Sequence, residues 1–327
     1  MATRIQDLSP EVQHFQSVFF PYATQRLLAV VQGGQRFVHY TTAEVAASIL
    51  ENSTVWMRNA LTMNDFSEIQ HGLNCISHAW KSEAGRKLRY VLDGVHPGIC
   101  ADLEQRFDAW QPDMRANTYL TCLSEHRSDE DTYGRLSMWR AYGGRSGIAL
   151  VINSRPFTTV SEGAGVYSSP VEYETPETFT EKLDSYQRGL DVNKQLLGAL
   201  SRGQLLETLF NVLRFAALCT KHPAFAEETE WRVMYAPNIE RSPVVMQEVR
   251  TVRGVPQLVQ MLPLRRYASD DQVAPGSSIP ELLDRIIIGP TEDAAAVYQA
   301  LEALLSAAGV ANPAAKLVIS GVPLRHL

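Results

Sequence analysis

The sequence predicts an α+β protein with a mixed or antiparallel sheet at its core and helical insertions between strands. Short apolar runs typical of strands recur along the 327 residues, but the helical stretches between them are uneven and do not alternate regularly with strands. The sequence also contains no G-x-G-x-x-G segment opening a strand–helix–strand unit, and no Walker A segment. These observations argue against a doubly wound sheet and against the common loops that bind dinucleotides and phosphates.

The length allows two average domains, or one domain with large insertions. Hydrophobic residues make up 45% of the chain and charged residues 20%, as in an ordinary globular protein. We expect a helical lead-in over residues 1–35 and a single α+β domain over residues 36–327. A helical insertion is expected at about residues 177–221, where leucines recur at helical spacing.

The first half of the chain contains clear signals for the ends of helices and strands. Within the lead-in, apolar residues at helical spacing are interrupted by Pro21. Thr41 and Glu44 fit a capping box that would start a helix running to about Asn52, and Asp65 fits the N-cap of a later helix. The predicted helices are 41–52, 65 onward, 101–110 and the short 136–142, and the predicted strands are 36–40, 54–58, 119–124 and 147–152.

The second half continues the mixture of strands and helices. Lys221-His222-Pro223 is expected to end the helical insertion, because proline cannot continue a helix. A helix is predicted from Asp293 to Ala308. The predicted strands are 163–167, 171–173, 230–235, 244–252, 258–263, 286–288 and 317–319.

Charge and hydropathy limit the classes of function. The net charge is −6 and the pI is near 5.8, which argues against a broad nucleic-acid surface. No run approaches the roughly 20 apolar residues that cross a bilayer, so no membrane association is expected. Residues 1–10 lack the apolar stretch of a secretory signal, and we expect a cytoplasmic protein.

No metal site is expected from the cysteines and histidines. The four cysteines form no C-x-x-C pair, and the eight histidines form no H-x-x-x-H pair. Cys122 and Cys219 lie in apolar runs, where reduced, buried thiols are the ordinary outcome.

The strongest candidate for chemistry is the acidic segment Glu228-Thr229-Glu230. Side chains alternate between the faces of a strand, so Glu228 and Glu230 should point the same way at a strand entrance. Two adjacent carboxylates disfavour each other unless a ligand, a cation or a reaction uses them. An ordinary exposed Glu230–Arg232 ion pair is an equally weighted alternative.

Other polar and aromatic residues are weaker candidates when taken singly. His39 ends a strand next to Tyr40 and Thr41, where a half-buried histidine is the simpler interpretation. Tyr142 precedes Gly143-Gly144, where the missing side chains would let a flat ligand approach, although simple packing is more usual. Two further candidates for ligand contacts are Asn64, beside a predicted helix cap, and Arg140, in an arginine cluster that neighbouring acids largely neutralise.

Taken together, these segments resemble a bacterial family of domains of unknown function, number twenty-nine seventy-one. The resemblance rests on four motifs spread over roughly residues 37–320, and the family name conveys no activity. The motifs are His39-Tyr40-Thr41, Asn64-Asp65-Phe66-Ser67-Glu68, Trp139-Arg140-Ala141-Tyr142-Gly143 and Pro223 to Arg232.

More remotely, the chain resembles the ADP-ribosyltransferases that use a His-Tyr-Glu pattern, because His39, Tyr142 and Glu230 occur in that order. The Ser-Thr-Ser motif of the other branch is missing. The resemblance implies that His39 binds a ribose of NAD, Tyr142 stacks on nicotinamide and Glu230 stabilises the ribosyl cation. Glu228 would orient or deprotonate the acceptor, and no metal would be needed.

The expected function is therefore transfer of ADP-ribose from NAD to an unidentified acceptor, as in toxins and defence effectors of that superfamily. Catalytic roles fall to Glu228 and Glu230, and binding roles to His39, Tyr40, Thr41, Asn64, Tyr142 and Arg140. One alternative is a metal-dependent nucleic-acid-processing enzyme that uses Asp65, Glu68, Glu228 and Glu230. Another is a non-enzymatic module that binds a nucleotide or a protein.

Overall fold

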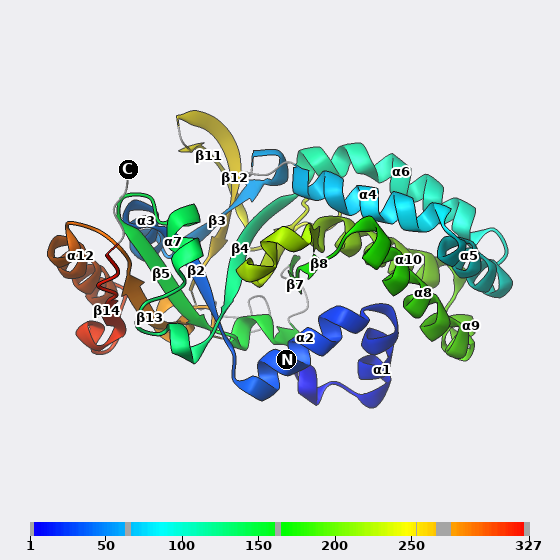
Figure 1. Ribbon diagram of the computed structural model, residues 1–327, viewed down its shortest axis with the longest axis horizontal. Coiled ribbons are helices and arrows are strands. Elements are labelled where there is room, and N and C mark those ends of the chain that lie inside the picture. Colours follow the sequence, from blue (N-terminus) through cyan, green and yellow to red (C-terminus); the bar gives the residue numbers. More distant parts are fainter. Residues whose placement is uncertain (1–2, 63–66, 161–164, 253, 266–275, 324–327) are drawn as a thin grey trace.

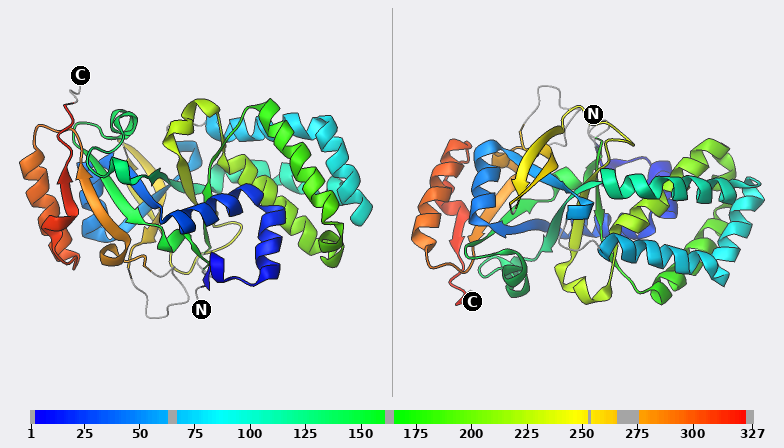
Figure 2. Two further views of the ribbon diagram at one scale, coloured as in Figure 1. Left: turned by 60° about the horizontal axis from the view of Figure 1, so that its bottom comes forward. Right: turned by 90° about the horizontal axis from the view of Figure 1, so that it is seen from above.

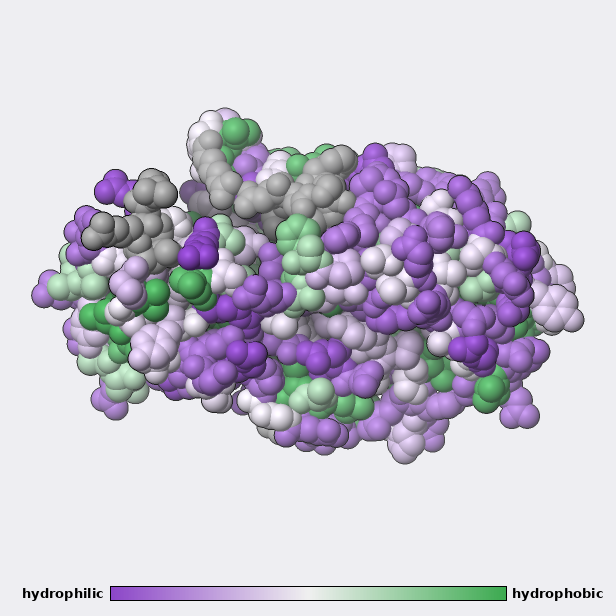
Figure 3. All heavy atoms as spheres, in the orientation of Figure 1, coloured by the Kyte–Doolittle hydropathy of each residue, from purple (hydrophilic) through white to green (hydrophobic). Residues whose placement is uncertain are grey.

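The computed structural model describes residues 3–62, 67–160, 165–252, 254–265 and 276–323. The molecule is elongated, with a sheet-centred part at one end and a group of long helices at the other (Figure 1). Its surface in this view is mostly hydrophilic, with apolar residues scattered in small groups, as is usual for a folded domain (Figure 3).

Among the described residues, ten strands form one mixed sheet, which confirms the predicted α+β class. The main order is β11-β12-β3-β4-β2-β5-β13-β14, and β10 pairs with both β4 and β7. All pairs in this sheet are antiparallel except β13 with β14. The strands are β2 (Arg36–Thr42), β3 (Thr54–Asn59), β4 (Tyr119–His126), β5 (Gly147–Asn153), β7 (Val166–Pro170), β10 (Glu230–Tyr235), β11 (Met246–Val252), β12 (Val255–Pro263), β13 (Leu283–Ile288) and β14 (Leu317–Ile319).

Helices cover both faces of the sheet-centred part (Figures 1 and 2). On one face, α3 (Ala43–Asn52) and α12 (Ala294–Ala307) pack over a core that includes Phe37 and Trp231. On the other face, α7 (Leu136–Tyr142) buries Trp139 against alternate residues of β2 and β5. The fully buried Trp139 therefore anchors α7 to the sheet.

The cap of α3 lies one residue later than predicted. Thr42, not Thr41, is the N-cap, and its hydroxyl accepts from the amide of Val45 at 3.4 Å. Glu44 is exposed in the first turn and closes no capping box. Thr41 instead remains in β2, paired with Ile148, so the strand extends through both threonines.

The helical part has its own apolar core, formed by helices from two separate stretches of the chain. The predicted continuous insertion at 177–221 is three helices, because Asn193 and Ser201 interrupt it as caps. Ser201 and Gln204 form a capping box. These helices are α4 (Ser67–Lys81), α5 (Glu83–Val95), α6 (Ile99–Asn117), α8 (Pro176–Val192), α9 (Lys194–Ala199) and α10 (Arg202–Cys219).

The N-terminal segment is helical, as predicted, and its two helices meet at Pro21. Helix α1 (Pro10–Phe19) ends just before Pro21, and α2 (Pro21–Gly33) begins there. The hydroxyl of Tyr22 donates to the carbonyl of Val171 at 3.2 Å, which fixes α2 beside the strand β7.

Short elements complete the fold. Strand β1 (Thr3–Arg4) pairs with β6 (Thr159–Val160), and β8 (Glu172–Tyr173) pairs with β9 (Thr220–Lys221) in parallel. Among the described helices, none is long and apolar enough to cross a membrane. The remaining elements are α11 (Ile279–Leu282), η1 (Ile5–Asp7), η2 (Ala60–Thr62), η3 (Ser128–Glu130), η4 (Arg155–Phe157), η5 (Pro223–Glu228) and η6 (Pro313–Lys316).

Candidate functional site

Glu228 and Glu230 converge, but not by strand alternation. Glu228 is the last residue of the 3-10 helix η5, and Glu230 is the first residue of β10. Thr229 between them has a φ of 43°, a left-handed conformation that is uncommon for a β-branched residue. This turn places both carboxylates around one ammonium group.

That ammonium group belongs to Lys221, whose sequence context Lys221-His222-Pro223 predicts only the end of a helix. Its Nζ lies 2.6 Å from Glu228 Oε2 and 3.1 Å from Glu230 Oε2. The side chain is 4% exposed, and Nζ also lies 4.5 Å from the centre of the Phe225 ring. Lys221 thus compensates the repulsion between the two carboxylates.

A second cation, Arg232, holds the other oxygen of Glu230. Arg232 Nε lies 2.8 Å from Glu230 Oε1, and its Nη1 donates to the carbonyl of Leu218. Both side chains are buried, so the alternative of an exposed Glu230–Arg232 pair is wrong. Burial alone would raise the pKa of Glu230, but the charges of Arg232 and Lys221 outweigh it and hold that pKa at about 2.

Two tyrosine hydroxyls complete the group of side chains. Tyr142, the last residue of α7, donates to Glu228 Oε1 at 3.1 Å. Tyr173 of β8 accepts from the amide of Glu230 at 2.8 Å. Burial raises the pKa of both phenols, and the negative charges of Glu228 and Glu230 raise it further. We call Tyr142, Tyr173, Lys221, Glu228, Glu230 and Arg232 the carboxylate cluster.

Solvent reaches the carboxylate cluster from one side. The ring of Tyr142 is 37% exposed and the side chain of Glu228 is 17% exposed, whereas that of Glu230 is 5% exposed. Glu228 is therefore the carboxylate available to a ligand, and Glu230 lies behind it.

Arg135 positions the segment that carries Glu228. Its guanidinium donates to the carbonyls of Glu227 at 2.6 Å and Glu125 at 3.0 Å, and it pairs with the buried carboxylate of Glu130 at 2.9 Å. Its amide donates to the hydroxyl of Tyr40 at 2.8 Å. Arg135 thus ties η5 to β4 and to the start of α7. Tyr40, which was predicted to bind a ligand, instead accepts a hydrogen bond from Arg135 and helps to hold this segment.

The structure does not bring His39 to the carboxylate cluster. The strand register explains why: Phe37 pairs with Glu125 and Trp231 with Leu123, so these four side chains share one face of the sheet. His39 follows on that same face, whereas Glu230 pairs with Ser124 on the opposite face.

The environment of His39 agrees with this placement. Its Nδ1 lies 2.9 Å from the carbonyl of Cys122, and burial lowers its pKa, which favours the neutral ring. His39 therefore does not lie in one site with Tyr142 and Glu230, contrary to what the resemblance to ADP-ribosyltransferases implies. Thr41 lies two residues beyond His39 on the same side of β2 and is likewise separated from the carboxylate cluster.

The other predicted binding residues have mixed outcomes. Arg140 is an exposed residue of α7, two residues before Tyr142, so the two side chains leave the helix in different directions. Asn64 and Asp65 lie outside the described residues. Glu68 is in α4, but its side chain is also outside the described part.

Within the described residues, no group of three histidine, cysteine, aspartate or glutamate side chains could hold a metal ion. Glu228 and Glu230 are instead held by Lys221, and Glu230 also by Arg232. The four cysteines are free thiols. Cys219 is buried as predicted, whereas Cys122, which was also predicted to be buried, is only half-buried.

Comparison with protein families gives a match over part of the chain. Residues 138–233 match the model of a family described as a protein of unknown function (DUF2971). The matched stretch runs from α7 to β10 and contains every side chain of the carboxylate cluster, whereas His39 lies outside it. The expected resemblance over residues 37–320 is thus shown for its central part. No curated protein and no solved structure matches the chain.

Proposed function

We propose that the chain is an enzyme similar to ADP-ribosyltransferases, which cleaves the bond between nicotinamide and ribose in NAD at the carboxylate cluster. The observation that carries this proposal is the pair of carboxylates, Glu228 and Glu230, held around one lysine beside an exposed tyrosine. The remaining ADP-ribose would pass to an acceptor that is not identified. A role as a toxin or defence effector is part of the proposal only through the resemblance.

The chemistry requires negative charge at the sugar. Cleavage of a glycosidic bond builds positive charge on the ribose, and a nearby carboxylate stabilises that charge without metal. With a pKa of about 2, Glu230 remains ionised at neutral pH. It therefore acts as a fixed negative charge and does not transfer protons.

Glu228 is the residue that we assign to contact with the substrate. Its Oε2 is held by Lys221, but its Oε1 accepts only the hydroxyl of Tyr142 among the described contacts. A ribose hydroxyl or an acceptor hydroxyl can donate a second hydrogen bond to Oε1, because a carboxylate oxygen accepts more than one. The same hydrogen bond keeps the Tyr142 ring beside the carboxylate, where it can stack on nicotinamide.

Lys221 and Arg232 are positioning residues in this scheme. They cancel much of the repulsion between the carboxylates, so that both stay ionised and close together. His39 takes no part, because it lies on the opposite face of the sheet.

The two alternatives receive less support from the geometry. For a metal-dependent nuclease, a cation would have to displace Lys221 from both carboxylates, and the described residues offer no third acidic ligand there. A pure binding module would not explain why two carboxylates are held close together, although a bound nucleotide would occupy the same surface.

The test is release of nicotinamide from NAD by the full-length protein, measured by chromatography with and without EDTA. We expect metal-independent release, with Glu228→Gln reducing the rate on the order of 100-fold or more. Glu227→Gln is the matched control, because Glu227 is an exposed neighbour that contacts Ser137 and not the cluster. Absence of release by the wild type, or equal rates for Glu228→Gln and Glu227→Gln, would refute the proposal.

A further inference from the structure

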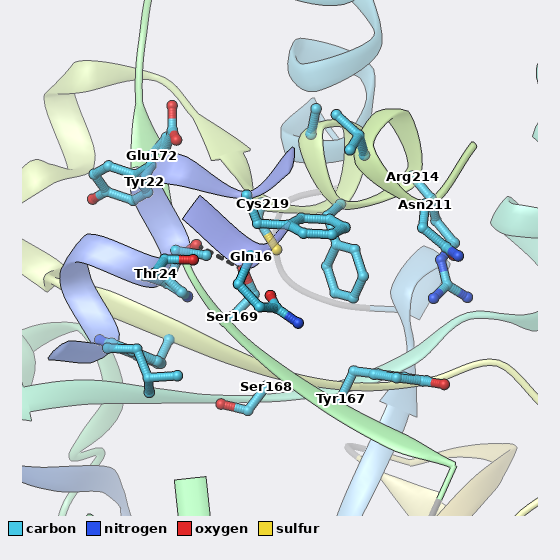
Figure 4. Close-up of a pocket in the computed structure, with 18 of the residues that line it drawn as sticks. Gln16, Tyr22, Thr24, Tyr167, Ser168, Ser169, Glu172, Asn211, Arg214 and Cys219 are labelled. Carbon is cyan, nitrogen blue, oxygen red and sulfur yellow. Dashed lines mark hydrogen bonds between the residues drawn. The ribbon is translucent and has the colours of Figure 1, made fainter. Parts of the chain in front are cut away.

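A large cavity lies apart from the carboxylate cluster, where α1, α2, α8 and α10 meet the strand β7 and the sheet (Figure 4). Its volume is about 1410 Å³, and most of its wall is apolar. None of Tyr142, Glu228 and Glu230 lines it, whereas His39 does. The cavity is thus a separate feature, on the face of the sheet where His39 lies.

Arg214 of α10 is one of the charged residues in the wall of this cavity, and two others, Lys182 and Glu172, are paired with each other. The residue is 6% exposed, and its guanidinium carbon lies 5.4 Å from the ring centre of Tyr167 and 5.1 Å from that of Phe215. Within the described part of the chain, the guanidinium makes no hydrogen bond or ion pair. The nearby carboxylate of Glu240 is instead engaged by the hydroxyl of Tyr167.

Such an arginine is unusual, because a buried charge ordinarily has an anionic or hydrogen-bonding partner. The cavity side of the guanidinium is where such a partner has space. Figure 4 shows Arg214 and Asn211 extending from the same helix near the end of the Tyr167 side chain. Asn211 also lines the cavity, so an amide and a guanidinium lie close to each other there.

Tyr186 of α8 provides a second, independent observation. Its side chain lines the cavity, and its buried hydroxyl has no hydrogen-bond partner among the described residues. A buried hydroxyl without a partner is costly, and native structures rarely leave one unmatched. Two residues of the cavity wall, on different helices, therefore carry a polar group without a hydrogen bond to the described part of the chain.

We propose that this cavity binds a ligand with a long apolar chain and one anionic end group, a carboxylate or a phosphate monoester, which pairs with Arg214. The apolar wall accounts for the chain, because burying apolar surface is the main source of affinity in such cavities. The planar guanidinium matches either anion with two parallel hydrogen bonds. A dinucleotide fits less well, because its many polar groups would face a wall with few partners.

The experiment measures binding to the full-length protein by a polyene fatty acid whose fluorescence increases in apolar surroundings. Hexadecanoate, hexadecyl phosphate and hexadecanol serve as competitors. We expect at least one of the two anions to compete roughly tenfold or more better than hexadecanol, because only an anion can form a charged pair with Arg214. The better anion identifies the end group. Equal competition by all three, or no saturable binding, would overturn the proposal.

Variants then locate the site. Arg214→Met should abolish the preference for anions and leave binding of hexadecanol unchanged, while Arg214→Lys should keep part of the preference. Arg188→Met is the matched control on α8, because Arg188 is exposed and paired with Asp184. Anion binding by Arg214→Met at the level of Arg188→Met would contradict the assignment.

A further variant tests the cavity itself. Gly189 lines the cavity from α8, and a side chain added there meets no atom within 4 Å. Gly189→Leu should fold, because leucine favours a helix more than glycine does. It should weaken the binding of all three chain compounds together. Unchanged binding would place these compounds elsewhere on the protein and refute the cavity site.

Discussion

Two buried arginines, Arg232 in the carboxylate cluster and Arg214 in the wall of the cavity, differ in whether they have hydrogen-bonding partners. Arg232 is enclosed by partners, the carboxylate of Glu230 and the carbonyl of Leu218. Arg214 contacts the rings of Tyr167 and Phe215, makes no hydrogen bond or ion pair with the described residues, and lines a cavity. The carboxylate cluster is thus complete within the chain, whereas the cavity is complete only with a ligand. Removing a partner from a buried charge destabilises the folded state. A buried charge that lacks a partner indicates a binding site.

Removing a partner from the carboxylate cluster should have the largest effect. Arg232→Met removes one of the two cationic partners of the buried Glu230 carboxylate and leaves Lys221. Breaking a buried pair in this way typically costs about 3–5 kcal/mol in the free energy of unfolding, which chemical denaturation would measure. In the control Arg188→Met, the lost ion pair is exposed, and the cost should be below about 1 kcal/mol. Equal losses would show that Arg232 is no more tightly coupled than a surface residue.

The second effect is a pH dependence of stability. The pKa of Glu230 is lowered from 4.5 to about 2 on folding, so the unfolded chain binds this proton more tightly. Its contribution, about 3 kcal/mol, should be present above about pH 4.5 and lost as the pH falls towards about 2.

The free energy of unfolding, measured across this range for the wild type and Glu230→Gln, isolates this contribution as a difference. The difference should shrink at low pH, where the wild-type carboxylate is protonated. A difference that does not change with pH would contradict the assigned ionisation of Glu230.

A smaller effect is expected for Tyr142→Phe. The change removes the hydrogen bond from the phenol to Glu228 and keeps the exposed ring. The free energy of unfolding should fall by about 1 kcal/mol or less, and the rate of nicotinamide release should fall less than in Glu228→Gln. A loss of activity as large as that of Glu228→Gln would make the hydroxyl, and not the ring, the essential part of Tyr142.

The smallest effect on stability should come from Arg214→Met. Its guanidinium loses only ring contacts, and replacing a buried unpaired charge by an apolar side chain removes a desolvation cost. The free energy of unfolding without ligand should change by about 1 kcal/mol or less, or rise. A loss like that of Arg232→Met would show that Arg214 has a structural partner and would weaken the case for a ligand.

Much of the fold could be predicted because it follows from local patterns. The apolar runs that became β4, β5 and β10 were predicted nearly to the residue. Caps were harder to place, because adjacent threonines such as Thr41 and Thr42 are equivalent in sequence. The breaks between α8, α9 and α10 were missed, since the apolar periodicity continues across them.

The carboxylate cluster could be predicted only in part. Glu228, Glu230 and Tyr142 were identified from local motifs and do lie together. Lys221 was missed as a partner, because its position depends on the packing of β9 beside η5. The face occupied by His39 depends on the register of β2 against β4, and one sequence does not specify that register.

The most direct test of the proposed function compares the two faces of the sheet in one assay. Nicotinamide release from NAD is measured for the wild type, Glu228→Gln and His39→Gln, after circular dichroism confirms that all three fold. We expect Glu228→Gln to lose on the order of 100-fold in rate and His39→Gln to stay within about twofold of the wild type. If His39→Gln is inactive while Glu228→Gln retains wild-type activity, the catalytic site lies on the other face and the assignment to the carboxylate cluster is wrong.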